Sequence, residues 1–270
     1  MCRLFGFRSN LATPVHRSLV SEQNSLRVQS HEHKDGWGIA SYPGELPVVA
    51  HGLGAAHGDP EFERVSSLLS SRTVLAHVRL ASVGRVHKLN AHPFVHGRWA
   101  FAHNGTVRDF AAHREELESG IARDLRAQLQ GETDSERCFY LFLTQLRENG
   151  REDAPSADDV ARALAQVTRQ VTRLTDQPDG QKPTSLNLLV TNGDLMVGSR
   201  LNRTLFFSEG RKHPATADRP PEGRHLEQLV IASEKLEGES HWHEVPERSM
   251  IGVGPRLTLR FWRTDSLVED

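Results

Sequence analysis

Hydrophobic residues recur along the chain at two spacings, which change from strand-like to helix-like and back. The first and last thirds contain short apolar runs rich in β-branched and aromatic residues, a pattern typical of strands. In the middle third, apolar residues recur every three or four positions, as on one face of a helix. This order predicts an α+β protein in which helices pack on a pair of mainly antiparallel sheets.

The strand pattern recurs in short segments on both sides of the helical third. These segments are 3–7, 39–42, 73–78, 98–102, 186–191, 195–198, 205–208, 228–233, 250–253 and 257–262. Asn192-Gly193 separates two of them and is a strong hairpin signal. The stretch 11–33 is polar and is expected to be irregular. Gly36 and Gly38, on either side of Trp37, indicate a tight backbone turn.

Helices are expected at 59–70, 110–129 with a break near Gly120, 133–146 and 156–174. Asp59 and Pro60 suit the start of the first helix, and Thr133 with Glu136 predicts a capping box. The loops 147–155, 176–183 and 210–225 have core-like strands on both sides. We therefore expect residues 1–270 to form a single domain.

Composition excludes several classes of function. Charged residues make up 25% of the chain, the formal net charge is −2, and no basic stripe with interleaved aromatics occurs, so nucleic acid is not expected as a partner. The first ten residues lack the apolar region of a signal peptide, and no later run suits a membrane span. We expect a cytoplasmic protein without membrane association, with both cysteines reduced and Cys138 in the core.

Cys2 directly follows the initiator methionine. If Met1 is removed, a thiol and a free α-amine share one Cα, and the amine, with a reference pKa of roughly 7.7 to 8.0, can accept the thiol proton. Other interpretations are a chance cysteine, a surface thiol or an acylated residue.

Three further positions are candidates by their chemistry. Arg79 ends a predicted buried strand, where a guanidinium needs either an anionic ligand or an internal carboxylate. Asn104-Gly105 follows another strand and is either an ordinary turn or, beside Cys2, a pair of donors for an oxyanion. Asp134 either stabilises the start of a helix or binds a substrate ammonium group.

Several short motifs, taken together and in order, resemble those of the class-II glutamine amidotransferases, which are N-terminal-nucleophile (Ntn) hydrolases. These motifs are Met1-Cys2, 77–82, 90–93, 103–105 and 132–134. The segments 33–38, 232–234 and 245–246 are similar to short stand-alone bacterial members. The resemblance implies a four-layer αββα sandwich, in which Cys2 Sγ attacks the side-chain amide of glutamine, ammonia leaves, and water hydrolyses the γ-glutamyl thioester.

The resemblance also assigns roles to residues. Arg79 would bind the α-carboxylate of glutamine with help from Ser82, and Asp134 would bind its α-amine. Asn104 and Gly105 would form the oxyanion hole.

The other implied roles concern the walls of the substrate pocket. The segment 79–84 corresponds to a loop that closes over substrate in relatives. Gly36 and Trp37 would line the opposite side, and His103 is grouped with the substrate-binding residues. Leu80 and Val83 depart from better-known members, which carry an aromatic residue and, in some, a histidine there.

Cofactors are not expected. The chain has no phosphate-binding loop for ATP, and its fifteen histidines include no paired helical metal motif. No synthase-like segment follows the amidotransferase motifs, so any ammonia acceptor is expected elsewhere, for example in a separate synthase subunit. Two alternatives to glutamine hydrolysis remain. One is hydrolysis of a γ-glutamyl-cysteinyl metabolite, as in ergothioneine biosynthesis, and the other is a non-catalytic, glutamine-binding regulatory protein.

Overall fold

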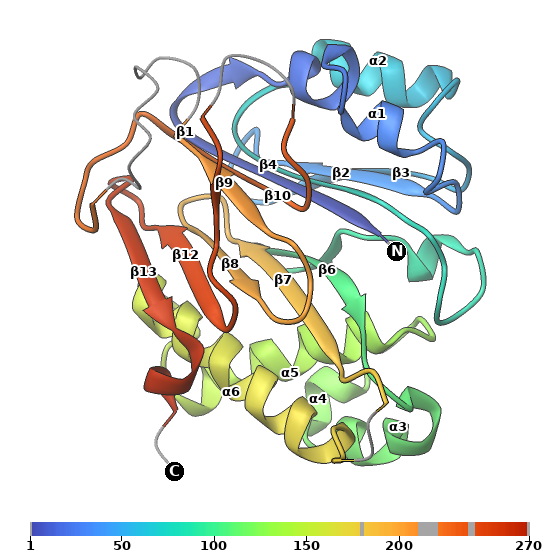
Figure 1. Ribbon diagram of the computed structural model, residues 1–270, viewed down its shortest axis with the longest axis vertical. Coiled ribbons are helices and arrows are strands. Elements are labelled where there is room, and N and C mark those ends of the chain that lie inside the picture. The colour runs from blue at the N-terminus through green and yellow to red at the C-terminus, as the bar shows by residue number, and fades with distance from the viewer. Residues whose placement is uncertain (1, 179–180, 210–220, 237–240, 269–270) are drawn as a thin grey trace.

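The expected pair of sheets is present in the computed structural model, which describes residues 2–178, 181–209, 221–236 and 241–268. The two sheets lie face to face with helices outside each of them (Figure 1). The described chain therefore has four layers in the order helix, sheet, sheet, helix. This is the α+β sandwich that the sequence predicts.

The first sheet combines strands from both ends of the chain. Its order is β11-β9-β10-β1-β4-β2-β3, and its neighbouring strands pair antiparallel. The strands are β1 (Arg3–Pro14), β2 (Trp37–Ser41), β3 (Val48–Gly52), β4 (Ser70–Val78), β9 (Phe206–Ser208), β10 (Gln228–Ala232) and β11 (His243–Glu244). Because β1 lies in the middle, the N-terminal segment is held on both sides by β4 and β10.

The second sheet has the order β13-β12-β8-β7-β6-β5 and is also antiparallel. Its strands are β5 (Phe94–His96), β6 (Trp99–Thr106), β7 (Ser185–Thr191), β8 (Met196–Arg200), β12 (Ser249–Val253) and β13 (Leu259–Arg263). The β7–β8 hairpin follows the prediction, although Thr191 pairs with Met196, so its loop has four residues rather than two. Gly193 takes φ of +93° in this loop.

Helices cover the outer face of each sheet. On the first sheet lie η1 (Arg17–Ser21), α1 (Leu26–Gln29) and α2 (Pro60–Leu68), and on the second lie α3 (Phe110–Ser119), α4 (Arg123–Arg126), α5 (Asp134–Glu148) and α6 (Ala157–Thr175). The described residues also form two 3-10 turns, η2 (Lys88–Asn90) and η3 (Thr264–Leu267).

Alternation along the strands builds a separate core at each interface. In β1, Leu4 packs between the sheets, whereas Phe5 and Phe7 pack under η1, α1 and α2. The core between the sheets joins Leu4 to residues such as Leu189 of the second sheet. Side chains at even positions near the start of β1 therefore face the second sheet.

The structure corrects several sequence-based expectations. The stretch 11–33 is not irregular throughout, because β1 extends to Pro14 and is followed by η1 and α1. The short strands β3, β5 and β11 were not predicted. Asn104-Gly105 is no turn, because both residues lie within β6 and pair with β7. The predicted loop 210–225 lies largely outside the described residues.

Helix starts follow the predicted capping signals, with one exception. Asp59 accepts from Glu61 N as expected, and Ser156, the first residue of the predicted helix 156–174, forms a capping box with Asp159. Thr133 caps α5 by accepting from Glu136 N, but the Glu136 carboxylate turns to the N–H groups of 130 and 131 instead of the cap residue. The predicted box at Thr133 is therefore only half formed.

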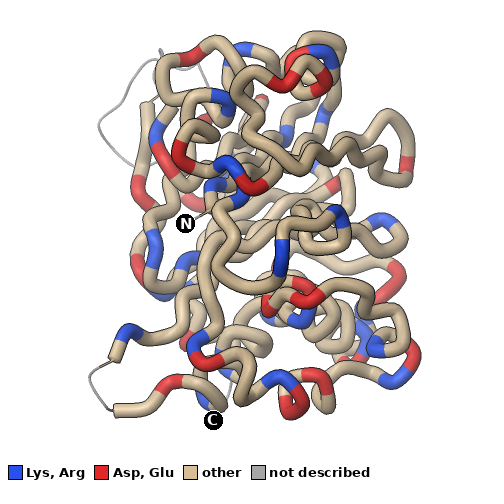
Figure 2. Tube along the Cα trace, turned by 90° about the vertical axis from the view of Figure 1, so that its right-hand side faces the viewer, with Lys and Arg blue, Asp and Glu red and all other residues tan. Residues whose placement is uncertain are grey.

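Acidic and basic residues are interspersed along the helices and loops of both outer layers (Figure 2). Within the described ranges, no helix is long and apolar enough to cross a membrane.

Candidate active site

Cys2 immediately precedes β1, next to the point where β4 ends. Arg3 pairs with Val78, so Cys2 lies opposite the residue that follows β4. By alternation Cys2 faces the same side as Leu4, toward the second sheet. The thiol is half-buried, and its Sγ lies 3.5 Å from the carbonyl oxygen of Leu80. The central position of β1 thus fixes the thiol at the edge between the two sheets.

The environment of Cys2 keeps the thiol protonated. Burial raises the pKa of the Cys2 thiol, because a thiolate loses hydration there, and the Asp134 carboxylate adds to the increase. The hydrogen bond to Leu80 and the charge of Arg79 act in the opposite direction without cancelling it. A nucleophilic Cys2 therefore requires a base.

Arg79 directly follows β4, and its side chain is buried. Its Nη2 donates to the carbonyl oxygens of Val83 and Gly84 at 2.8 and 3.1 Å, and its Nη1 donates to that of Arg85 at 3.1 Å. Among the described residues, none supplies a carboxylate at ion-pair distance. Burial lowers the pKa of Arg79, and the charges of an ionised Cys2, of Asp35 and of Asp134 act against that shift.

The segment 80–85 surrounds the Arg79 guanidinium, and hydrogen bonds to other parts of the chain hold it near both ends. Asp35 Oδ2 accepts from Ala81 N at 2.8 Å near its start. At its end, Glu132 Oε2 accepts from Arg85 N at 3.3 Å, and Asn90 Nδ2 donates to Arg85 O at 3.0 Å. Asp35, Asn90 and Glu132 stand in the matched motifs, but sequence reasoning gave them no role.

Ser82 is exposed in the middle of this segment. Its Oγ lies 3.5 Å from Thr106 Oγ1, at the end of β6. The segment therefore reaches across from the first sheet to the residue that follows Gly105.

Asn104 and Gly105 come from β6, on the facing sheet. The Asn104 side chain is 3% exposed, and its Nδ2 lies 3.1 Å from Ser233 Oγ, just after β10 of the first sheet. Asn104 therefore faces the interior between the sheets, as Cys2 does. A Cβ on Gly105 would lie 1.9 Å from the carbonyl oxygen of Ser185, so only glycine fits the observed backbone.

Asp134 begins α5 and points its carboxylate at backbone donors. Its Oδ2 accepts from Val107 N at 2.8 Å, and its Oδ1 accepts from Ser135 N at 2.8 Å. Asp134 is buried, yet its charge acts on both Cys2 and Arg79. Asp134 therefore stabilises the start of α5 and also lies near the nucleophile.

His103 lies on the other face of β6. Its Nδ1 is 2.9 Å from Ser135 Oγ and its Nε2 is 3.0 Å from Ser185 O. Burial lowers the pKa of His103, so the ring is neutral near neutral pH. Because neighbouring side chains alternate across a strand, His103 points toward the α5 layer when Asn104 points inward. His103 therefore contacts Ser135, the residue after Asp134, from the face of β6 opposite to Asn104.

Gly36 and Trp37 differ in their position relative to the site. Gly36 accepts from Arg79 N at 2.8 Å through its carbonyl oxygen, and its φ of +138° suits glycine. The Trp37 indole is buried in the outer core, donates from Nε1 to Asp59 Oδ2 at 2.7 Å and packs edge-on against Phe62. The structure places Gly36 beside Arg79 but turns the Trp37 side chain away from Cys2.

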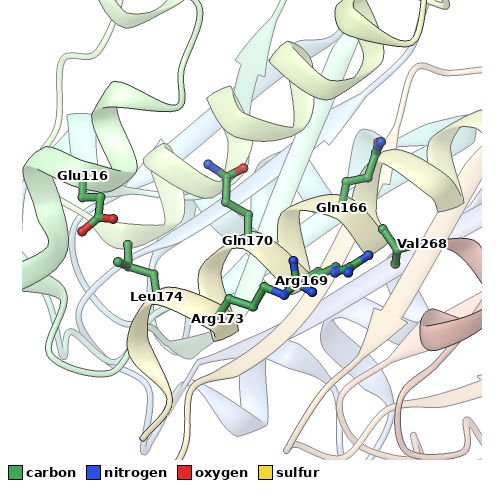
Figure 3. Close-up of a pocket in the computed structure, with 7 residues that line it drawn as sticks. All are labelled: Glu116, Gln166, Arg169, Gln170, Arg173, Leu174 and Val268. Atoms are coloured by element: carbon green, nitrogen blue, oxygen red, sulfur yellow. The ribbon is translucent and has the colours of Figure 1, made fainter. Parts of the chain in front are cut away.

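Other features of the chain lie apart from this group. In the ranges that the structure describes, no three His, Cys, Asp or Glu side chains are grouped to hold a metal ion. Cys138 is fully buried in α5, and burial raises the pKa of its thiol well above the usual value. A hollow of about 580 Å³ lies along α6 and contains no nucleophile (Figure 3). It is lined by Glu116, Gln166, Arg169, Gln170, Arg173, Leu174 and Val268.

The four layers, with a cysteine at the start of a central strand, define an α+β sandwich of the Ntn-hydrolase type. Residues 1–219 match the model for class-II glutamine amidotransferases, and the chain belongs to that family. It is thus an enzyme that acts on amides.

Two relatives match nearly the whole chain. A probable glutamine amidotransferase of Saccharomyces cerevisiae, DUG3, is 26% identical over 96% of this chain and 83% of its own length. The γ-glutamyl-hercynylcysteine sulfoxide hydrolase of Mycobacterium tuberculosis is 25% identical over 94% of this chain and 93% of its own.

Solved structures share the fold. A glutamine aminotransferase class-II domain protein of Silicibacter pomeroyi superposes with a TM-score of 0.64 at 20% identity, covering 97% of this chain and 99% of that chain. The glutamine phosphoribosylpyrophosphate amidotransferase of B. subtilis gives 0.62 at 17% identity, with 97% of this chain matching 49% of its own.

Proposed function

We propose that the protein hydrolyses the γ-amide of glutamine through a thioester on Cys2. The observation that carries this proposal is the pairing of opposite charges beside a nucleophile. Arg79, without a carboxylate partner in the described chain, and Asp134 both act electrostatically on Cys2. A free α-amino acid carries a carboxylate and an ammonium group on one carbon, so this pair suits its recognition.

The reaction begins with attack of Cys2 Sγ on the side-chain carbonyl carbon of glutamine. The thiol proton passes to the α-amine of Cys2, since the raised thiol pKa leaves little thiolate. The Asn104 amide and the Gly105 N–H stabilise the negative carbonyl oxygen. Met1 lies outside the described residues, and its removal is part of the proposal.

Collapse of this intermediate breaks the carbon–nitrogen bond. The protonated α-amine gives its proton to the leaving nitrogen, and ammonia departs. Water then attacks the γ-glutamyl thioester and gives a proton to the now neutral α-amine, the sulfur leaves and recovers that proton, and glutamate is released. Arg79, with Ser82, holds the α-carboxylate throughout, while Asp134 holds the α-ammonium group and Gly36 borders the site.

One alternative changes only the leaving group. The relative named γ-glutamyl-hercynylcysteine sulfoxide hydrolase matches almost end to end, which supports a γ-glutamyl amide other than glutamine as acyl donor. In that case a γ-glutamyl-cysteinyl compound is hydrolysed well and glutamine poorly.

Release of glutamate and ammonia by the purified protein tests the proposal directly. Cys2→Ala is expected to abolish release, whereas Cys138→Ala, which changes the other cysteine, is expected to retain it. An active Cys2→Ala variant would contradict the mechanism. Saturable glutamine binding by a correctly processed protein that turns over no γ-glutamyl substrate would favour a regulatory role.

The destination of ammonia belongs to the same proposal. A separate synthase subunit is the expected acceptor, and a cytoplasmic location is expected for both. Co-purification from native cells, followed by transfer of label from the glutamine amide nitrogen, tests the first of these expectations.

A further inference from the structure

Ser233 connects the two strands that carry the proposed catalytic groups. It follows β10, has no exposed surface, and donates from its backbone N to Leu4 O at 3.1 Å. Its Oγ lies 3.1 Å from Leu4 N and 3.1 Å from Asn104 Nδ2. One hydroxyl therefore touches β1, two residues beyond Cys2, and the side chain of Asn104 on the facing sheet.

The Ser233 hydroxyl and the Asn104 amide do not use all of their hydrogen-bonding capacity. A serine hydroxyl has one donor and two acceptor sites, and Leu4 N–H occupies one acceptor. Asn104 Oδ1 is buried and has no hydrogen-bond partner among the described residues. A buried acceptor without a partner costs free energy, whereas an orientation that presents Nδ2 at that position is satisfied once an anionic oxygen binds there.

Rotation of the Asn104 amide by about 180° provides that arrangement, since it exchanges Oδ1 and Nδ2 at nearly the same positions. The Ser233 hydroxyl then donates to Oδ1 while still accepting from Leu4 N. Both hydrogens of Nδ2 become free for another acceptor. A continuous chain results, from Leu4 N–H through Ser233 to Asn104, in which each bond polarises the next.

We propose that Ser233 is a positioning residue, which orients the Asn104 amide so that Nδ2 donates to the oxyanion of the γ-glutamyl intermediate. This inference rests on the proposed function. An oxyanion donor is effective only if it is held in place before the charge develops. Because the same oxygen atom also holds β1, Ser233 sets the distance between the nucleophile strand and the oxyanion donor.

Steady-state kinetics of Ser233 variants test the proposal. Ser233→Ala is expected to lower kcat by about tenfold to hundredfold, which is no more than the loss caused by removing one oxyanion donor. KM should change by less than about twofold. Ser71→Ala is the matched control, because Ser71 is also buried and accepts from backbone N–H groups, near the opposite end of β4. The control is expected to retain kcat.

A second comparison separates the hydroxyl from packing. Thr and Val have nearly the same shape, but only Thr keeps the hydroxyl, so Ser233→Thr should keep a kcat at least about tenfold above that of Ser233→Val. If Ser233→Ala does not fold, the comparison of Ser233→Thr with Ser233→Val still tests whether the hydroxyl is needed. Alkylation of Cys2 by iodoacetamide should proceed at the wild-type rate in the variants, since the nucleophile is intact.

A double-mutant cycle completes the test. In an Asn104→Ala background, Ser233→Ala should cost less than about threefold in kcat, because its effect passes through Asn104. Independent, multiplying losses, or equal kcat for Thr and Val, would overturn the role of Ser233 while leaving the proposed function standing. A wild-type protein that hydrolyses no γ-glutamyl substrate would overturn the proposed function itself.

Discussion

At the scale of single residues, Arg79 shows how burial and charge together point to a ligand. The sequence allowed either an internal ion pair or an external carboxylate. Within the described chain the guanidinium binds three backbone carbonyl oxygens, which carry no net charge. A buried cation held only by dipoles favours an anionic ligand.

Arg79→Lys is expected to raise the KM for glutamine by about tenfold to hundredfold, because lysine cannot make the paired hydrogen bonds of a guanidinium. The change in kcat should be smaller. Arg64→Lys is the control, since Arg64 pairs with Glu61 on the exposed face of α2. An unchanged KM in Arg79→Lys would show that the carboxylate binds elsewhere.

A functional role could be predicted from the sequence only for residues whose chemistry depends on neighbouring positions in the chain. Cys2, Arg79 and Asp134 could be proposed as candidates from the sequence, because terminal position, burial and charge can be inferred from short segments. Ser233 received no role, because its partners Leu4 and Asn104 come near it only in the folded chain.

Buried histidines make the fold sensitive to acid. Burial lowers the pKa of His77 from 6.5 to about 3, and it also lowers the pKa values of His92 and His103. The unfolded chain therefore binds protons below about pH 6.5 that the folded chain does not. The free energy of unfolding should fall with falling pH, by up to about 1.4 kcal/mol per pH unit for each such group.

Urea unfolding between about pH 6.5 and 5.5, above the range in which most carboxylates titrate, measures this dependence. His77→Gln should reduce the slope by up to about one proton. A slope that is the same in His77→Gln and wild type would contradict a neutral His77.

At the scale of elements, β6 shows where sequence reasoning failed. Asn104-Gly105 is a common turn dipeptide, and the apolar pattern of β6 ends before it. The strand nevertheless continues, because β7 pairs with both residues and Gly105 allows Ser185 to approach closely. Cross-strand packing overrides a local signal here, and the pairing partner is about eighty residues away in sequence.

The start of α5 connects stability with the site, because Thr133 caps the helix that begins with Asp134. Thr133→Ala should lower the free energy of unfolding by about 1 kcal/mol through loss of the bond to Glu136 N. Thr172→Ala, inside α6, is the control and should cost less. Denaturant unfolding measures both, and equal costs would show that the cap contributes nothing specific.

At the scale of the molecule, the core between the sheets joins strands from both ends of the chain. We propose that residues 1–270 unfold as one domain. Trp37 lies in the core outside the first sheet and Trp99 in the core outside the second. Single-tryptophan variants retaining one or the other should report the same denaturation midpoint, and two separated midpoints would indicate two folding units.

The whole-molecule arrangement also explains why the site needs the complete sandwich. Cys2 and Arg79 come from the first sheet, Asn104 from the second, and Asp134 from the start of α5. The sequence predicted each element, except the part of β6 that carries Asn104, but the meeting of their ends at one edge comes from the stacking of the sheets.

Intact-mass measurement of the native protein, before and after treatment with the glutamine analogue 6-diazo-5-oxo-norleucine, tests the central claim most directly. The proposed mechanism predicts loss of Met1 and a single adduct on Cys2, absent in Cys2→Ala and retained in Cys138→Ala. A retained Met1, or an adduct on another residue, would contradict Cys2 as an N-terminal nucleophile for γ-glutamyl substrates.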